Sequence, residues 1–282
     1  MRIPFKLALV FLFFFSAGPS SSQLFASSDV EFVIVIPSYN NNKVDESGKN
    51  WIKENLSSVF RQTYKRWTIR YINDCSTDGT GRVAVRFIKQ KGMQRQCRVV
   101  HNPSNRGALA NLYMAIADCD PKKVIVLLDG DDVLAHPRVL ERVAREYRKK
   151  KAWITYGSYR AYPKGSRKFG SPFPQHVMRE RSFRSYKWVS SHLRTFYAKL
   201  FQSIKKDDLL YKGKFFGGGW DLIIMFPMLE MASQGHIRYI SDLLYLWRTH
   251  DANDRKIHTD EQRLANEWVR AQPPYPALQK LF

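Results

Sequence analysis

The chain has 282 residues, of which 46 are Lys or Arg and 25 are Asp or Glu, so its formal net charge is +21. Hydrophobic residues make up 44% and charged residues 25%, which is typical of a folded globular chain and excludes disorder over the whole length. The mean hydropathy of -0.41 excludes a protein that crosses a membrane many times. Cys75, Cys97 and Cys119 form no Cys-x-x-Cys pair, so neither a disulfide scaffold nor a zinc ribbon is indicated.

The first 28 residues have the pattern of an export signal. Arg2 and Lys6 precede an apolar run at residues 7–15, and small and polar residues follow it. The run is shorter than the roughly 18–20 residues of a transmembrane span, so a cleaved signal peptide is favoured and an uncleaved anchor is the alternative. These features predict the lumen of the secretory pathway or a membrane-anchored enzyme, with the cytosolic face of a membrane as the alternative location.

After residue 28, apolar strands and amphipathic helices alternate. The continuous apolar run at residues 31–40 is typical of a buried parallel strand that leaves the sheet at Pro37. Further strands are predicted at 67–74, 97–102 and 123–132, and helices at 51–62, 83–92 and 108–119. Thr77 or Asp78 is expected to cap the second helix. This alternation predicts an α/β fold with a mostly parallel, doubly wound sheet.

Three polar clusters follow the predicted strands, at residues 38–40, 73–74 and 129–132. In parallel sheets, ligands bind beyond the carboxyl ends of the strands, so the clusters are expected to converge on one site. The last cluster contains an Asp-Gly-Asp, and paired carboxylates suit Mg²⁺ or Mn²⁺; a plain turn is the alternative. Asp74 can accept a hydrogen bond from the imide N–H of uracil or bind a ribose hydroxyl, with a turn or capping role as the alternative.

The segments IPSYNN, INDCSTDGT, NPSNRGALANLYMAI and VLLDGDD, in this order, resemble the nucleotide-sugar domain of family 2 glycosyltransferases with the GT-A fold. The resemblance covers about residues 30–135 and is weaker up to about residue 255. It implies a Rossmann-like GT-A fold with a nucleotide-sugar-binding half at 29–135. The acceptor-binding and catalytic half, with a helical C-terminal part, is then expected at 136–282.

The resemblance also implies where the donor and a metal bind. The residues expected to hold the uridine nucleotide are Pro37, Tyr39, Asp74, Asn105 and Arg106. The metal motif falls on Asp129 and Asp131, with Asp131 as the expected ligand of the diphosphate-bound cation and Asp129 nearer the ribose. Further along the chain, His250 is expected to complete the metal shell and Arg248 to neutralise the leaving diphosphate. A purely structural histidine is the alternative for His250.

An inverting transfer needs a carboxylate to deprotonate the attacking hydroxyl. The family supplies this base from an acidic pair that opens a helix, and Trp220-Asp221 stands at the matching position. Asp221 is therefore the expected base, although the chain has one carboxylate where the family usually has two. A helix-opening aspartate favoured by the helix dipole is the alternative. Glu230 is the second candidate, more than two helical turns further on.

Residues 138–214 contain 21 of the 46 basic residues and 5 of the 25 acidic ones. Such a segment attracts anions, although a basic surface without a partner is the alternative. Its basic, aromatic part at 156–187 is expected to contact an anionic or membrane-linked glycan, through Lys164, Arg167 and Lys168. An apolar stripe at 192–204 predicts a core-packing helix.

Together these patterns predict a glycosyltransferase that depends on Mn²⁺ or Mg²⁺ and moves a sugar from a UDP-sugar to a hydroxyl of a glycan or glycoconjugate. Peripheral membrane association is expected, and nucleic acid is not expected as a partner. One alternative is a nucleotidyltransferase on a similar fold, but the segment after the first strand lacks the glycine-rich phosphate loop that it requires. The other is a non-catalytic binder of anionic glycans or nucleic acid, which has no use for the carboxylate cluster.

Overall fold

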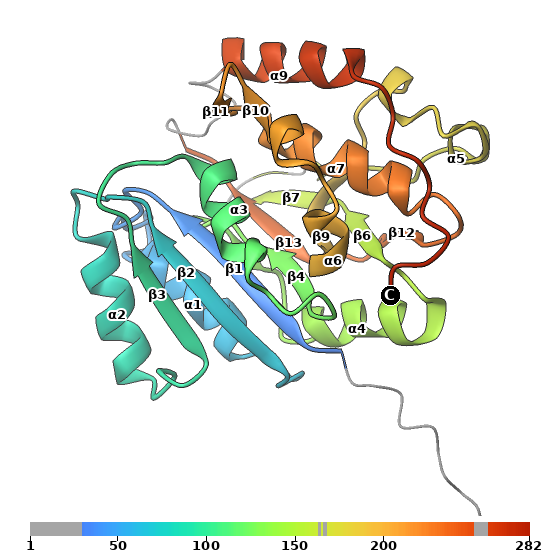
Figure 1. Cartoon of the computed structure of the whole chain (residues 1–282). Helices are drawn as coiled ribbons and strands as arrows, with labels where there is room; N and C mark the ends of the chain where they lie inside the picture. Colours follow the sequence, from blue (N-terminus) through green and yellow to red (C-terminus); the bar gives the residue numbers. More distant parts are fainter. Residues whose placement is uncertain (1–29, 163–164, 166–167, 251–258) are drawn as a thin grey trace, which may run out of the picture.

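The structure, a computed structural model, describes residues 30–162, 165, 168–250 and 259–282 (Figure 1). The predicted export signal at residues 1–28 lies outside the described residues, and so do Lys164 and Arg167 of the expected acceptor segment. No helix in these ranges is both long enough and apolar enough to cross a membrane.

The centre of the fold is a seven-stranded sheet in the order β12-β6-β9-β4-β1-β2-β3 (Figure 1). Its strands are β1 (Phe32–Ser38), β2 (Trp67–Asn73), β3 (Cys97–His101), β4 (Val124–Leu127), β6 (Ile154–Gly157), β9 (Ser191–Tyr197) and β12 (Ile237–Tyr239). Only β9 runs antiparallel to its neighbours, β4 and β6. The predicted α/β fold with a mostly parallel sheet is confirmed. One sheet takes strands from both of the expected halves.

Helices cover both faces of the sheet. One face packs against α1 (Trp51–Phe60), α2 (Thr80–Gln90) and α4 (Val139–Lys150), and the other against α3 (Ala108–Ala117), α6 (Ala198–Gln202) and α7 (Trp220–Met231). The outer helix α9 (Thr259–Ala271) packs on α7. Alternate residues of β1 belong to the two cores, Ile34 and Ile36 to the first and Val33 and Val35 to the second. Burial on both faces explains why the run is continuously apolar.

A second sheet of four short strands brings residues 245–248 to the acidic cluster (residues 129–132). Its order is β5-β13-β7-β8, with β5 (Val133–Leu134), β13 (Tyr245–Arg248), β7 (Tyr159–Tyr162) and β8 (Lys168–Phe169). Because β13 pairs with β5, the segment containing Arg248 lies beside the acidic cluster. The remaining short elements are β10 (Leu210–Tyr211), β11 (Lys214–Phe215), α5 (Gln175–Glu180), and the 3-10 helices η1 (Phe183–Ser185) and η2 (Lys206–Leu209).

The strands and helices predicted up to residue 132 correspond to β1–β4 and α1–α3, with ends that differ by a few residues. The cap of α2 is different: its N-cap is Gly79, with φ 85°, and neither Thr77 nor Asp78. Asp78 still contributes, because its Oδ1 accepts a hydrogen bond from the backbone N–H of Thr80 at 2.9 Å.

The helix predicted at residues 192–204 is wrong. Residues Ser191–Tyr197 form β9, and only Ala198–Gln202 are helical. β9 fills the gap between β4 and β6, where its apolar side chains are buried by the sheet and by helices of both layers. A short apolar run fits a buried strand and a buried helix equally well, so pairing with strands far along the chain decided its conformation.

Candidate active site

The loops that follow β1 and β2 are joined at the carboxyl edge of the sheet. The backbone N–H of Asp74 donates to the carbonyl of Ser38 at 2.9 Å, and that of Asn40 donates to Ser76 Oγ at 3.0 Å. Tyr39 lies between these contacts, and its side chain is 50% exposed. The predicted donor residues on these two loops are therefore neighbours, with an aromatic ring exposed beside them.

Asp74 orders the loop between β3 and α3. Its Oδ1 accepts from Asn102 Nδ2 at 2.7 Å and from the backbone N–H of Arg106 at 2.9 Å, and its Oδ2 accepts from Gly107 N at 2.9 Å. Asn105 Oδ1 also accepts from Gly107 N, at 3.1 Å. A carboxylate has about four acceptor positions, so these three bonds leave one position unoccupied on a side chain that is 3% exposed. The structure thus brings together Asp74, Asn105 and Arg106 as expected.

The acidic cluster packs against the loop after β1. The backbone N–H of Gly130 donates to the carbonyl of Pro37 at 3.1 Å. A Cβ atom at Gly130 would lie 2.7 Å from Ser38 Oγ, so the close approach of the two segments requires glycine. This contact brings the acidic cluster against the predicted nucleotide residues.

Asp131 and His250 form a pair of candidate metal ligands. Asp131 Oδ2 lies 2.8 Å from His250 Nε2, and the two side chains are 18% and 15% exposed. The His250 ring also packs against Trp51, with 4.9 Å between the ring centroids. A carboxylate oxygen beside an imidazole nitrogen is a donor set that fits Mn²⁺. Since the described ranges contain no group of three or more possible ligands, substrate phosphates and water would have to complete the coordination.

Asp132 ties β13 to the acidic cluster. It is 1% exposed, and its Oδ2 accepts from the Tyr245 hydroxyl at 2.6 Å while its Oδ1 accepts from the backbone N–H of Arg248 at 2.6 Å. The Tyr245 hydroxyl also lies 3.3 Å from Asp129 Oδ2. Burial, together with the charges of Asp131 and Asp129, raises the pKa of Asp132 well above its ordinary value.

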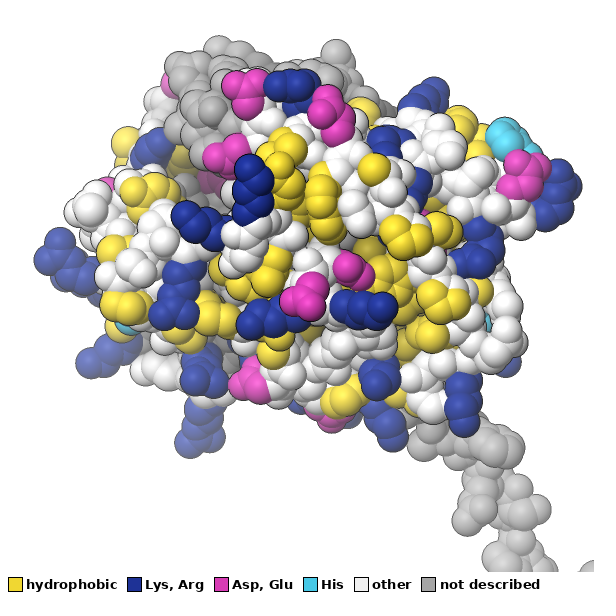
Figure 2. Space-filling model, turned by 45° about the horizontal axis from the view of Figure 1, so that its top comes forward, with side chains coloured by type: hydrophobic (Ala, Val, Ile, Leu, Met, Phe, Trp, Pro, Cys, Tyr) yellow, Lys and Arg dark blue, Asp and Glu magenta, His cyan; other side chains and the backbone are white. Residues whose placement is uncertain are grey.

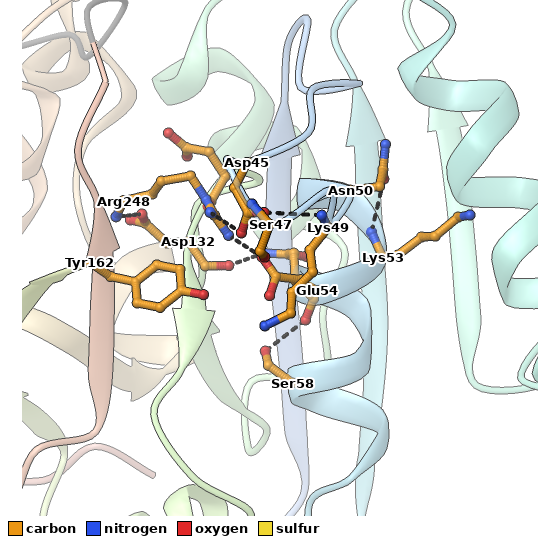
Figure 3. Close-up of polar contacts among 12 residues, drawn as sticks. Asp45, Ser47, Lys49, Asn50, Lys53, Glu54, Ser58, Asp132, Tyr162 and Arg248 are labelled. Carbon is orange, nitrogen blue, oxygen red and sulfur yellow. Dashed lines mark hydrogen bonds and ion pairs between the residues drawn. The ribbon is translucent and has the colours of Figure 1, made fainter. Parts of the chain in front are cut away.

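Arg248 is buried, with 2% of its surface exposed, and lies beside Asp132 and Tyr162 (Figure 3). Its guanidinium lies 4.9 Å from the Trp51 ring and 5.0 Å from the Tyr162 ring. Nη2 donates to Glu54 Oε2 at 2.7 Å, and Nε donates to the backbone carbonyl of Asp131 at 2.8 Å. These contacts position the backbone of Asp131. The contact with the leaving diphosphate that was expected of Arg248 stays a prediction.

Asp221 lies in the first turn of α7, after Gly219, whose φ of 65° starts the helix. Asp221 Oδ2 accepts from Arg194 Nη2 at 2.7 Å, and the two side chains are 23% and 4% exposed. In β9, Thr195 pairs with Val126, so Arg194 lies beside the end of β4 that leads into the acidic cluster. The buried arginine therefore holds the expected base at the same edge of the sheet as the donor residues.

Glu230, the second candidate base, lies inside the core. It is fully buried, its two carboxylate oxygens bind Arg184 at 2.5 and 2.9 Å, and it accepts from the backbone N–H of Tyr275 at 2.8 Å. A base must reach the hydroxyl proton directly or through one water. This arrangement gives Glu230 a structural role and leaves Asp221 as the candidate.

Sequence reasoning missed the residues that support these side chains. They are Trp51, Glu54, Tyr162, Arg194 and Tyr245. Glu54 lies 194 positions from Arg248, and an acidic residue in the first turn of a helix is expected at a surface because of the helix dipole. No local sequence pattern predicts which residue is the partner. A lone arginine in an apolar strand such as β13 indicates only that a partner is needed.

Residues 33–213 match the family model described as glycosyl transferase family 2. Over 241 residues the chain is 26% identical to glycosyltransferase GlyG of Streptococcus pneumoniae, covering 80% of this chain and 73% of GlyG. It is also 28% identical over 99 residues to a Bacillus subtilis protein named for teichuronic acid biosynthesis, TuaG, covering 35% of each chain.

Two solved structures have the same fold. The Staphylococcus aureus TarS fragment 1–349 in complex with UDP matches with a TM-score of 0.56 and 17% identity, over 79% of this chain and 61% of that one. The mannosyltransferase PcManGT of Pyrobaculum calidifontis, in complex with GDP-Man and Mn²⁺, matches with a TM-score of 0.58 and 14% identity. That match covers 88% of this chain and 67% of PcManGT. The expected GT-A fold is confirmed, and because the family model spans more than half of the sequence, the chain belongs to glycosyl transferase family 2.

Proposed function

We propose that this glycosyltransferase moves a sugar from a UDP-sugar to a hydroxyl of a glycan or glycoconjugate, with a divalent metal and with inversion. The observation that carries the proposal is the Asp131–His250 pair at the carboxyl edge of the sheet, with Asp74 and Asp221 at that same edge. A solved structure of the same fold that contains UDP supports the choice of nucleotide.

The donor nucleotide would lie across the loops after β1, β2 and β3. The exposed Tyr39 ring offers a surface on which a base can stack, and the remaining acceptor position of Asp74 suits the imide N–H of uracil. Asn105 and Arg106 stand on the loop that Asp74 orders, and Asp129 is assigned to the ribose. All of these side chains would contact the nucleoside part of the donor. The sugar to be transferred would then point toward the second half of the chain.

Asp131 and His250 would hold Mn²⁺ or Mg²⁺, and Asp129 stands beside them. A cation held there would supply a Lewis acid to offset the charge of the departing diphosphate. Arg248 contributes by fixing the backbone of Asp131 through its Nε, while Glu54 and the flanking rings fix Arg248 itself.

Asp221 is assigned the role of general base. The acceptor oxygen forms a bond to the anomeric carbon, the bond from that carbon to the diphosphate oxygen breaks, and UDP leaves with the bonding electrons. The proton of the acceptor hydroxyl passes to the Asp221 carboxylate, which Arg194 holds in place. Because attack and departure occur on opposite sides of the anomeric carbon, the product is inverted. General-base catalysis of this kind contributes about 10²–10⁴-fold to a rate.

The acceptor is proposed to be an anionic or membrane-linked glycan. TuaG is named for teichuronic acid biosynthesis, and an acid is anionic at neutral pH. The last turn of α4 carries Arg148, Lys149 and Lys150, which would attract an anion. On the face shown in Figure 2, Lys and Arg side chains are scattered among apolar and acidic ones, without the continuous basic stripe of a nucleic-acid track. The relatives reported above are bacterial proteins. We therefore propose that the enzyme acts at the cytosolic face of a membrane and not in a secretory lumen.

Release of UDP from a panel of UDP-sugars in the presence of Mn²⁺ tests this proposal without a known acceptor. The wild type should hydrolyse at least one UDP-sugar, and Asp221→Asn should lower the rate about 10²–10⁴-fold while UDP still binds. Asp207→Asn, which changes an exposed aspartate in η2, is the matched control and should leave the rate unchanged. Equal rates for Asp221→Asn and the control would remove Asp221 as the base.

A further inference from the structure

Residues of β2, β3 and α3 line a groove of about 320 Å³. Figure 1 shows these three elements at the β3 edge of the central sheet. We propose that it binds the phosphate group of a small phosphate ester, at a site that uses neither the acidic cluster nor Asp221. The proposal does not depend on the transferase reaction. It rests on a buried hydrogen-bond donor in the groove and on the arginines around it.

The donor is the side-chain amide of Asn111, which is 1% exposed and lines the groove. Its orientation follows from its neighbours, because the carboxylate of Asp74 can only accept. Asn102 must therefore turn its Nδ2 toward Asp74 Oδ1, at 2.7 Å, and the same Nδ2 donates to Asn111 Oδ1 at 2.7 Å. This leaves the Nδ2 of Asn111 buried without a partner.

An unpaired buried donor costs stability unless a ligand satisfies it. The amide of Asn111 requires an acceptor atom, so the groove selects a ligand with an oxygen at that point. It would disfavour a ligand that presents an amino group there. The geometry thus defines one contact of the ligand before its charge is considered.

The groove also carries a net positive charge. Three arginines, Arg70, Arg98 and Arg106, line it, and Asp118 is the one carboxylate among its lining residues. Arg70 is occupied by its ion pair with Asp118 and by the carbonyl of Ala115. The hydrogen bond from Arg70 lowers the pKa of Asp118, which therefore stays charged and neutralises that arginine. The exposed guanidiniums of Arg98 and Arg106 are left to meet an anion, although Arg106 Nη1 also donates to the thioether sulfur of Met114 at 2.9 Å.

A phosphate group fits this arrangement better than a carboxylate does. Its three terminal oxygens can accept from the amide of Asn111 and from two arginines at once, whereas a carboxylate has only two oxygens. The walls between these groups are apolar, with Ile72, Val100 and Met114, so the organic part of an ester has a surface to pack on. A volume of about 320 Å³ exceeds that of a phosphate ion alone and leaves room for it.

Occupation of the groove would reach the donor site through two shared residues. Asn102 binds both Asn111 and Asp74, and Arg106 lines the groove while its backbone N–H binds Asp74. A phosphate held here therefore competes with the nucleotide for Arg106. Phosphate is expected to weaken UDP binding to the wild type, and about tenfold more phosphate should be needed for the same effect on Arg98→Ala.

The test is a calorimetric titration of the full chain with inorganic phosphate in the absence of divalent metal. Arg98→Ala should weaken phosphate binding about tenfold or more, because a charged hydrogen bond is lost. Asn111→Asp keeps the acceptor for Asn102 but replaces the donor by a charged oxygen, so it should abolish binding. Arg86→Ala removes an exposed arginine of α2 and is the matched control, expected to bind phosphate as the wild type does.

UDP binding to Arg98→Ala shows that this variant is folded. Equal weakening by Arg98→Ala and Arg86→Ala, unchanged binding by Asn111→Asp, or no phosphate binding by the wild type would each overturn the assignment. Glycerol 3-phosphate and dimethyl phosphate then distinguish the source of the phosphate. Tighter binding of glycerol 3-phosphate is expected, because its phosphate keeps three terminal oxygens. Tighter binding of dimethyl phosphate, which has only two, would overturn the three-point arrangement. Neither result depends on whether the chain hydrolyses a UDP-sugar.

Discussion

Replacing Glu54 by glutamine tests whether the buried Arg248 positions the metal-binding loop. Glu54 Oε2 lies 2.7 Å from Arg248 Nη2, and the two side chains are 21% and 2% exposed (Figure 3). Glu54→Gln preserves the shape of the side chain and one acceptor oxygen but removes the charge. The guanidinium then loses its nearest anion. It keeps the carbonyl of Asp131, the two aromatic rings and the more distant carboxylate of Asp45, at 3.9 Å.

Breaking a buried ion pair by removing one partner costs about 3–5 kcal/mol. Because Glu54 is partly exposed and the amide oxygen can still accept, we expect a smaller cost, about 2 kcal/mol. For a chain of this length, that corresponds to a fall of about 4–8 °C in Tm. Loosening of Arg248 also frees the backbone of Asp131, so Mn²⁺-dependent binding of UDP should weaken as well.

Urea unfolding and calorimetric UDP titration of the same samples measure both effects. The control is Glu180→Gln, because Glu180 pairs with Arg179 at 3.4 Å at the surface, where both side chains are more than half exposed. Exposed pairs contribute about 0–1 kcal/mol, so the control should unfold nearly as the wild type does. If Glu54→Gln is as stable as Glu180→Gln and binds UDP equally well, the positioning role of Arg248 is refuted.

Three further changes test other parts of the structure. Burial, with the charge of Arg194, lowers the pKa of His192 well below 6.5, so the unfolded chain gains a proton on acidification that the folded chain does not. Between about pH 7.5 and 5.5, His192→Gln should therefore lose about 1 kcal/mol less free energy of unfolding than the wild type does. An equal loss in the variant and the wild type would contradict this. Glu230→Gln, which removes the counter-charge of the buried Arg184, should lower the free energy of unfolding in urea by about 3 kcal/mol with UDP affinity unchanged. Gly130→Ala should abolish UDP binding, because its Cβ has no room; normal affinity would show that the loops are not tightly joined.

The first half of the fold was predictable because its signals are local. β1 and β4 are continuous apolar runs, and polar residues follow each of them directly, so the run alone predicted both the strand and the edge at which a ligand binds. Residues 192–204 were misassigned because an apolar stripe lacks information about its partners. Their strand conformation depends on pairing with β4, about 70 residues earlier in the chain, and with β6, about 40 residues earlier.

In the candidate site, too, some residues could be predicted from local sequence patterns and others could not. Asp74, Asp129 and Asp131 follow strands, and their convergence follows from the geometry of a parallel sheet. Their support comes from residues distant in sequence, such as Glu54 beneath Arg248 and Arg194 beside Asp221. Those pairs form because a buried charge needs a partner, which the fold supplies and a sequence window does not reveal.

The central claim is that Asp131 and His250 bind a divalent cation together with the diphosphate of the donor. Calorimetric titration of the full chain with UDP, with and without Mn²⁺, tests it most directly when Asp131→Asn and the control Asp207→Asn are measured alongside. The account predicts that UDP binding requires Mn²⁺, is lost in Asp131→Asn and is retained in Asp207→Asn. Binding of UDP that is indifferent to Mn²⁺ and to Asp131→Asn, or no binding of UDP by the wild type, would contradict it.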